Sequence, residues 1–339
     1  MTPRLSVIIP VRNGSDFVRG AIASAQAIPV EPLEIVLVDD GSTDGTWELL
    51  QRLAADDSRL LVVRRDGDHG AAAARNAGLA EARADVVCFL DADDVVFAEP
   101  IARRLEWHEA HPRALLSFAD HQSLLPGGAI EPRASAYYPR FQKFVNGRKG
   151  IVELGVQAFD LLYGENPVCT SGSMARRDAL IALGGFVREL SRAQDWDMWI
   201  RLARCGGVAY SNRIETQYTV RPGSLSHDIK DRNRHIAKVV RRHLGYALRR
   251  NPVTALAALS HVEDARAEHC RQANRNVAAW THYLTAFVLC PKVRQARDVA
   301  RATAVLMGMR SGRIESLEER ARLVALRGAR VLASDVPAR

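Results

Sequence analysis

Short apolar runs that alternate with helix-forming stretches dominate the first hundred residues. Four runs have the length and the branched side chains of buried strands, at 5–9, 34–38, 60–63 and 86–90. Between them, capping residues and helically spaced apolar residues predict helices that begin near residue 15, near residue 43 or 44, and near residue 71. Strands that alternate with helices of this length are typical of βαβ units. The sequence therefore predicts an α/β fold with a mostly parallel sheet.

Polar side chains follow the ends of these four predicted strands, the first of which should end at Pro10. They belong to Asn13, Asp39, Asp40, Arg64, Asp91 and Asp93. Ligands of an open α/β sheet bind in the crevice beyond the carboxyl ends of its strands. Four separate regions of the chain are therefore expected to build one site at this edge.

The run 86–90 breaks abruptly into three carboxylates, Asp91, Asp93 and Asp94. Side chains two residues apart at a strand end project to the same side, so Asp91 and Asp93 can face one point. Hard divalent cations prefer such oxygen ligands, and Mg²⁺ commonly takes one or two carboxylates together with substrate phosphates. The motif indicates a metal site. The alternative is a polar turn in which Asp93 or Asp94 caps a following helix.

The alternation of strand and helix signals weakens after residue 100. We expect a helix over 102–110, a strand over 115–118 and an irregular, substrate-facing segment over 131–166. Strand and helix signals return at 173–175 and 178–183, before a helix over 196–203. From about residue 229 the chain is expected to be almost wholly helical, with breaks at Pro252 and Pro291.

Composition places the chain among ordinary globular proteins. Apolar residues make up 47% and charged residues 25% of its 339 residues. No apolar run is long enough to span a bilayer, and no secretory signal is expected at the N-terminus. Its five cysteines are scattered, without the spacing of a disulfide framework or zinc site, which fits a reducing compartment. A cytoplasmic location is expected.

The positive charge is concentrated in the last third. Residues 226–339 contain 22 Lys and Arg against 10 Asp and Glu, a net charge of +12, whereas the rest of the chain has a net charge of −4. One interpretation is peripheral contact with an anionic membrane at its inner face. A helical cap or a homodimer interface is the alternative. Nucleic-acid binding is not expected, because only charge favours it.

With these features in place, the sequence resembles the family 2 inverting glycosyltransferases of GT-A fold. The resemblance covers about 1–225. Its motifs are SVIIPVRNG (6–14), LVDDGSTDGT (37–46), AARNAGL (73–79), FLDADD (89–94), GGF (184–186) and QDWDMWIRL (194–202). It implies a GT-A domain with a nucleotide-sugar-binding half, 1–100, and an acceptor-binding half, 101–228. The basic helical region 229–339 would follow as a C-terminal extension.

The resemblance implies an inverting transfer of sugar from a nucleotide-diphosphate-sugar to a hydroxyl of a glycan or lipid-linked acceptor. A UDP-sugar is the expected donor, and Mn²⁺ or Mg²⁺ the expected cofactor. Asp93 would bind the metal, with Asp91 and His227 as further ligands. The donor would contact Pro10, Asp39, Asp40, Arg75, Asp91 and Arg221. Asp195 would act as the general base that takes the proton of the acceptor hydroxyl.

Structural alternatives accompany these roles. Asp39 and Asp40 could cap the next helix, Arg75 could be a solvated helix residue, and Asp195 could cap the helix over 196–203. Asp197 could be an exposed acid of the first helical turn. The residue before Asp195 is Gln194, where the family usually has Glu, which puts a second acidic contact to the acceptor in doubt.

Two other functions remain open from the sequence. The chain could be a catalytically inactive scaffold or binding protein of the same fold. It could also be a nucleotidyltransferase acting on sugar phosphates, although such enzymes generally carry a Gly-rich basic phosphate loop where this chain has PVRNGSD.

Overall fold

The computed structural model describes residues 2–131, 133–221 and 229–307. The chain divides into two compact units, Met1–His227 and Asp228–Arg339.

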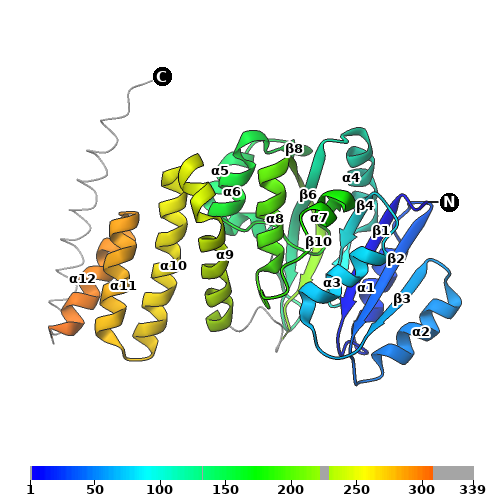
Figure 1. Ribbon diagram of the computed structural model, residues 1–339, viewed down its shortest axis with the longest axis horizontal. Coiled ribbons are helices and arrows are strands. Elements are labelled where there is room, and N and C mark those ends of the chain that lie inside the picture. The colour runs from blue at the N-terminus through cyan, green and yellow to red at the C-terminus, as the bar shows by residue number, and fades with distance from the viewer. Residues whose placement is uncertain (1, 132, 222–228, 308–339) are drawn as a thin grey trace. The chain divides into compact units, whose positions relative to one another are not determined.

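One mixed sheet forms the centre of the first unit (Figure 1). Among the described residues its strands are β1 (Leu5–Val11), β2 (Leu33–Asp40), β3 (Leu60–Arg65), β4 (Val86–Phe89), β5 (Val95–Val96), β6 (Ala114–Leu124), β7 (Ile130–Glu131), β8 (Ile151–Glu153), β9 (Met174–Arg176) and β10 (Gly207–Thr219). Their order is β3-β2-β1-β4-β9-β6-β10-β5, with β7 beside β6 and β8 beside β10. Strands β3, β2, β1 and β4 run parallel, as do β6 and β10. Strand β9 is antiparallel to both of its neighbours. The α/β prediction with a mostly parallel sheet is confirmed.

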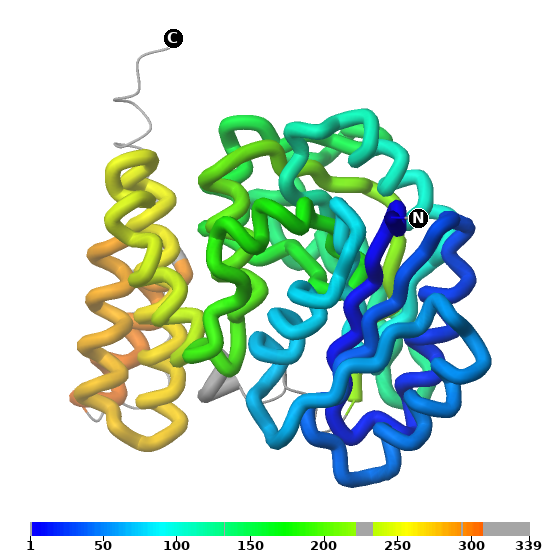
Figure 2. Tube along the Cα trace, turned by 45° about the vertical axis from the view of Figure 1, so that its right-hand side comes forward, coloured from blue at the N-terminus to red at the C-terminus, as the bar shows by residue number. Residues whose placement is uncertain are grey.

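Helices cover both faces of this sheet. They are α1 (Val18–Gln26), α2 (Thr46–Asp56), α3 (Gly70–Glu81), α4 (Ala98–Ala110), α5 (Pro139–Val145), α6 (Ala158–Gly164), α7 (Arg177–Ala182) and α8 (Gln194–Cys205). Side chains of α3, α5, α6, α7 and α8 share one core with the sheet, and those of α1, α2 and α4 share the other. Figure 2 shows α3, in cyan, lying against the blue strands. Because both faces are covered, β1 and β2 are buried along nearly their whole length, which explains their continuous apolar sequences.

A glycine sets the close approach of α3 to β1. A Cβ atom at Gly78 would lie 2.4 Å from Cγ2 of Ile8 and 3.1 Å from Cγ2 of Val38. Any larger residue would therefore push the helix away from the sheet.

Two local predictions are wrong. Strand β1 does not end at Pro10 but continues to Val11. Proline is tolerated there because β4 pairs with β1 only as far as Ile8, so the missing N–H has no strand to bond. The segment 131–166 is not irregular, since α5, β8 and α6 lie within it. These elements are three to seven residues long, too short to show a clear hydrophobic period.

The second unit is helical where it is described. It contains α9 (Ile229–Arg250), α10 (Pro252–Gln272), α11 (Asn276–Leu289) and α12 (Val293–Leu306). Pro252 opens α10, where the Asn251 side chain accepts a hydrogen bond from the Thr254 amide. A further break follows Gln272, and Asn274 there adopts a positive φ of 55°. Across the described residues, no helix is both long and apolar enough to cross a membrane.

Candidate functional site

The loops after β1 and β2 are tied together by side chains. The side-chain Oδ1 of Asn13 accepts a hydrogen bond from the backbone amide of Thr43 at 2.8 Å. The backbone amide of Asn13 donates to the Ser42 hydroxyl at 2.9 Å. Asp44 accepts from the amides of Ser15 and Thr46. Burial raises the pKa of Asp44, but these hydrogen bonds outweigh it and lower the pKa to about 2. The two loops therefore form one rigid rim, and α1 and α2 begin about three residues later than predicted.

Asp39 and Asp40 are buried at the end of β2. Oδ2 of Asp40 accepts hydrogen bonds from the amides of His69, at 3.2 Å, and Gly70, at 2.8 Å, where α3 begins. The alternative that this pair caps the next helix is wrong, because Asp40 lies at the start of α3 and not of α2. Oδ1 of each Asp is buried without a hydrogen bond, and Oδ1 of Asp40 lies 3.5 Å from Nη1 of Arg65 in an ion pair. Buried oxygens normally have partners, so both can accept from a ligand.

Arg75 projects from α3 and is 4% exposed, so it is not a solvated helix residue. Its Nη2 donates to Oδ1 of Asp91 at 2.5 Å. Burial by itself would lower the pKa of Arg75. The negative charges of Asp91 and Asp195 outweigh this effect, so the net pKa is raised above the usual value for arginine. Nε and Nη1 are buried and have no hydrogen-bond partner. One buried cation thus lies near the carboxylates of Asp91, just after β4, and Asp195, in α8, and it keeps N–H donors for a ligand.

The residues after β4 form a turn, closed by a hydrogen bond from the Asp94 amide to the Asp91 carbonyl at 3.1 Å. The strand ends at Phe89, so strand alternation is not what orients Asp91 and Asp93. Asp93 forms an ion pair with Arg221, whose Nη2 lies 2.7 Å from its Oδ2. The Arg221 guanidinium also lies 3.8 Å from the centre of the Phe17 ring. Asp91 and Asp93 are therefore held by different arginines.

Asp91 and Asp93 suit a metal ion that takes most of its ligands from substrate phosphates or water. Their side chains are 33% and 21% exposed, and one oxygen of each has no hydrogen bond within the described chain. Two carboxylates of this kind are a usual protein share of an Mg²⁺ or Mn²⁺ site. Among the described residues, no group of three or more His, Cys, Asp or Glu side chains is arranged so that it could hold a metal ion. His227, the third predicted ligand, lies outside them.

Asp94 has a position that sequence reasoning missed. It is 1% exposed, and it does not cap α4, which begins at Ala98. Its Oδ2 accepts from the Ser171 hydroxyl at 2.5 Å, and its Oδ1 accepts from the Thr219 amide at 2.8 Å. Burial, reinforced by the charge of Asp91, raises the pKa of Asp94 well above its usual value. Asp94 thus joins three segments around the site.

Asp195 is the second residue of α8. Its Oδ2 accepts from the Thr170 hydroxyl at 2.6 Å, and its Oδ1 accepts from the Trp196 amide at 2.8 Å. Ala193 is the N-cap of this helix, so the alternative that Asp195 caps it is wrong. A carboxylate oxygen has two lone pairs, so each oxygen can still accept a further proton donor.

Asp197 and the tryptophans form the support beneath Asp195. Asp197 is fully buried and pairs with Arg201 at 2.8 Å, so it is not an exposed first-turn acid. Trp196 donates its indole N–H to the Leu162 carbonyl at 2.6 Å, and Trp199 lies in the core.

Asn76 fixes α3 to the segment before α8. Its side-chain amide donates to the Phe186 carbonyl at 2.8 Å and accepts from the Phe186 amide at 2.7 Å. Asn76 and Gly78 thus act in the packing of α3.

The predicted site residues that the structure describes lie at the carboxyl ends of β1, β2 and β4, in α3 and at the start of α8. They are Pro10, Asp39, Asp40, Arg75, Asp91, Asp93 and Asp195, together with Arg221 just after β10. The edge offers partly exposed carboxylates for a cation, a buried guanidinium for an anion, and a carboxylate that can take a proton.

The chain resembles known proteins in sequence. Residues 6–182 match the glycosyl transferase family 2. The UDP-Glc:alpha-D-GlcNAc-diphosphoundecaprenol beta-1,3-glucosyltransferase WfaP of Escherichia coli is 30% identical over 229 residues, which cover 66% of this chain and 79% of that protein. Several other curated glycosyltransferases match over less than half of their own length.

Two solved structures resemble the chain in fold. S. aureus TarS 1-349 in complex with UDP-GlcNAc has a TM-score of 0.61 at 14% identity, with 96% of this chain and 91% of that chain covered. The mannosyltransferase PcManGT from Pyrobaculum calidifontis in complex with GDP-Man and Mn²⁺ has a TM-score of 0.60 at 17% identity, with 96% and 88% covered.

Proposed function

The chain belongs to glycosyl transferase family 2 and has a GT-A fold, and from this premise we propose that it is an inverting, metal-dependent enzyme that transfers a sugar from a nucleotide-diphosphate-sugar. We propose a UDP-sugar as donor, as in the name of the E. coli relative, and a hydroxyl of a glycan or lipid-linked glycan as acceptor. The observation that carries this proposal is the position of Arg75, a buried cation beside both Asp91 and Asp195.

The donor nucleotide would bind beyond β1 and β2. The Oδ1 atoms of Asp39 and Asp40 have no hydrogen bond and can accept from a base N–H or a ribose hydroxyl, with Pro10 beside them in β1. The free Nε and Nη1 of Arg75 suit phosphate or ribose oxygens. We propose residues 1–100 as the donor half and 101–228 as the acceptor half.

Asp93 would hold Mn²⁺ or Mg²⁺, with Asp91 and His227 as further ligands. When bound, such an ion neutralises the negative charge that builds on the departing nucleoside diphosphate. Arg221 now occupies one oxygen of Asp93, so we propose that this ion pair opens on donor binding. The freed guanidinium is then available for the diphosphate.

Asp195 would act as general base. The acceptor oxygen attacks C1 of the sugar, the bond from C1 to the diphosphate oxygen breaks, and that oxygen leaves with the electron pair. The proton of the acceptor hydroxyl passes to the Asp195 carboxylate. The Thr170 hydroxyl and the Trp196 amide fix the orientation of that carboxylate.

Thermal stabilisation of the purified full chain by UDP, GDP and dTDP, each with and without Mn²⁺, tests the donor site. A ligand that binds only the folded state raises its stability by mass action. We expect a Mn²⁺-dependent shift with UDP that Asp93→Asn abolishes, whereas the exposed Asp56→Asn, a matched control, retains it. No shift with any nucleotide at millimolar concentration would contradict the donor site and favour an inactive scaffold.

A further inference from the structure

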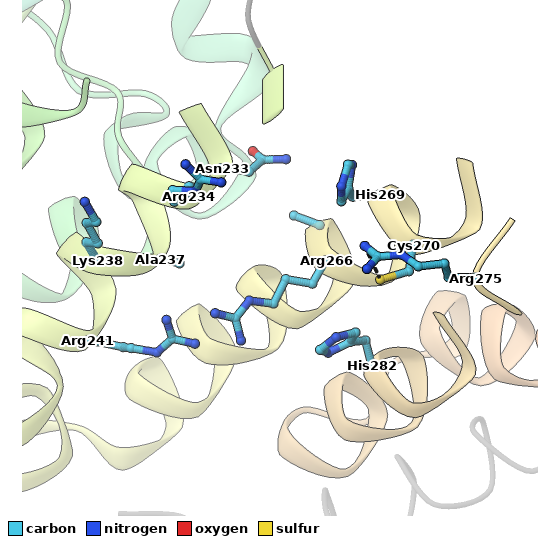
Figure 3. Close-up of a pocket in the computed structure, with 11 residues that line it drawn as sticks. Asn233, Arg234, Ala237, Lys238, Arg241, Arg266, His269, Cys270, Arg275 and His282 are labelled. Carbon is cyan, nitrogen blue, oxygen red and sulfur yellow. Dashed lines mark hydrogen bonds between the residues drawn. The ribbon is translucent and has the colours of Figure 1, made fainter. Parts of the chain in front are cut away.

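The helical second unit contains a cationic pocket of its own. Its cavity has a volume of about 430 Å³, within the usual range for small-molecule sites. Helices α9, α10 and α11 and the turn after α10 form its walls (Figure 3). The polar and charged lining residues are Asn233, Arg234, Lys238, Arg241, Arg266, His269, Cys270, Arg275 and His282. All belong to the unit 228–339, whereas the predicted donor and acceptor residues belong to 1–227.

Positive charge in this pocket exceeds its negative partners. Glu263 is the carboxylate that neutralises several of the lining groups. Its Oε1 lies 2.8 Å from Arg266 and 4.0 Å from Arg241, and its Oε2 lies 2.7 Å from Nδ1 of His282. One carboxylate therefore faces two guanidinium groups and an imidazole.

The other three cations are not neutralised. Arg234, Lys238 and Arg275 have no carboxylate partner within the described part of the chain, and Nη2 of Arg275 reaches only the Cys270 sulfur at 3.6 Å. Figure 3 shows Arg234 and Arg275 on opposite sides of the pocket. Like charges held around one cavity repel one another, so a polyanion between them would relieve that repulsion.

We propose that this pocket binds a phosphate-bearing group. Guanidinium groups present paired N–H donors that match phosphate oxygens, and several of them together favour a ligand with more than one negative charge. The ligand chemistry is therefore a phosphate or diphosphate, carried by a lipid headgroup or by a soluble molecule. This goes beyond the proposed transferase activity, because the pocket contains none of the residues assigned to it.

Calorimetric titration of the full chain with pyrophosphate, at low ionic strength and without divalent metal, tests the proposal. The pocket variant is Arg234→Gln with Arg275→Gln, which removes two charges without leaving Glu263 unpaired. The control, Arg249→Gln with Arg294→Gln, removes the same charge at exposed positions outside the pocket. We expect the pocket variant to bind pyrophosphate about tenfold or more weakly, and the control to bind like the wild type.

Vesicles distinguish the two sources of phosphate. If flotation with phosphatidylcholine vesicles containing phosphatidic acid depends on Arg234 and Arg275, the ligand is a lipid headgroup; pyrophosphate binding without flotation identifies a soluble phosphate. Equal pyrophosphate affinity and equal flotation for the pocket variant and its control would overturn the proposal. Circular dichroism and UDP–Mn²⁺ stabilisation of the pocket variant report its folding and its donor site, so failure here is separable from failure of the proposed function.

Discussion

His108 should make the first unit less stable as the pH falls. It is fully buried, and its Nε2 lies 2.8 Å from the Ser117 hydroxyl. Burial, reinforced by the positive charges of Arg104 and Arg176, lowers the pKa of His108 to about 3. The folded chain therefore keeps this imidazole neutral at a pH where the unfolded chain protonates it.

The direction and size of the effect follow from proton linkage. An unfolded histidine has a pKa of about 6.5, so below that pH the unfolded state takes up a proton that the folded state refuses. Between pH 7.5 and pH 5 this difference removes about 2 kcal/mol from the free energy of unfolding. The result depends little on whether the folded pKa is about 3 or about 4, because both are well below pH 5.

Urea unfolding at pH 7.5 and pH 5, followed by tryptophan fluorescence, measures this loss. Four of the five tryptophans lie in the first unit, so the signal reports mainly on it. His108→Gln cannot take up the proton, so its stability should fall by about 2 kcal/mol less than that of the wild type. His69→Gln, at an exposed position, should behave like the wild type. An equal loss in the wild type and His108→Gln would refute the reasoning.

Three further substitutions test the site and its support. Asp195→Asn should lower the rate of UDP release from a UDP-sugar by about 10²–10⁴-fold while UDP–Mn²⁺ stabilisation persists; a wild-type rate would exclude Asp195 as the base. Gly78→Ala should destabilise the fold by about 1–3 kcal/mol in urea unfolding, because the added Cβ would lie 2.4 Å from Ile8. The control is Gly20→Ala in α1, where no atom lies within 4 Å of the added Cβ, and it should be neutral or stabilise the fold by up to about 1 kcal/mol. If Gly78→Ala and Gly20→Ala changed the free energy of unfolding equally, α3 would be able to shift away from β1 without loss of stability. Arg104→Met should cost about 3–5 kcal/mol in the same assay, because it leaves the carboxylate of Glu215 buried without its 2.7 Å partner; a loss under 1 kcal/mol would contradict that.

The parallel part of the sheet could be predicted because its strands are covered on both faces. Such strands are continuous apolar runs, and the sequence of β1, β2 and β4 shows them directly. The elements within 131–166 could not be predicted. Their few residues are ordered by contacts with distant parts of the chain, as where Val152 of β8 pairs with Tyr210 of β10.

The residue types of the site could be predicted better than their partners. The carboxylates at the end of β2 and just after β4 were visible as polar breaks in apolar sequence. The partner of Asp93 is Arg221, 128 residues away, and Asp94 joins residues 77 and 125 positions away. No local spacing reveals such pairs. Asp197 was the avoidable error, because Arg201 stands four residues later on the same helix face.

The order of strands in the sheet limits how this enzyme can be recombined with its relatives. Strand β5 lies in the first hundred residues, yet it pairs with β10 at the far end of the sheet, and β9 enters between β4 and β6. A segment ending at residue 100 would lack β10, the partner of β5, and β9, the partner of β4. The exposed edge of β4 would then favour aggregation. The proposed donor half, residues 1–100, therefore cannot be moved into a relative as an independent segment. A chimera with a new donor preference would have to inherit β9 and β10 together with the first hundred residues.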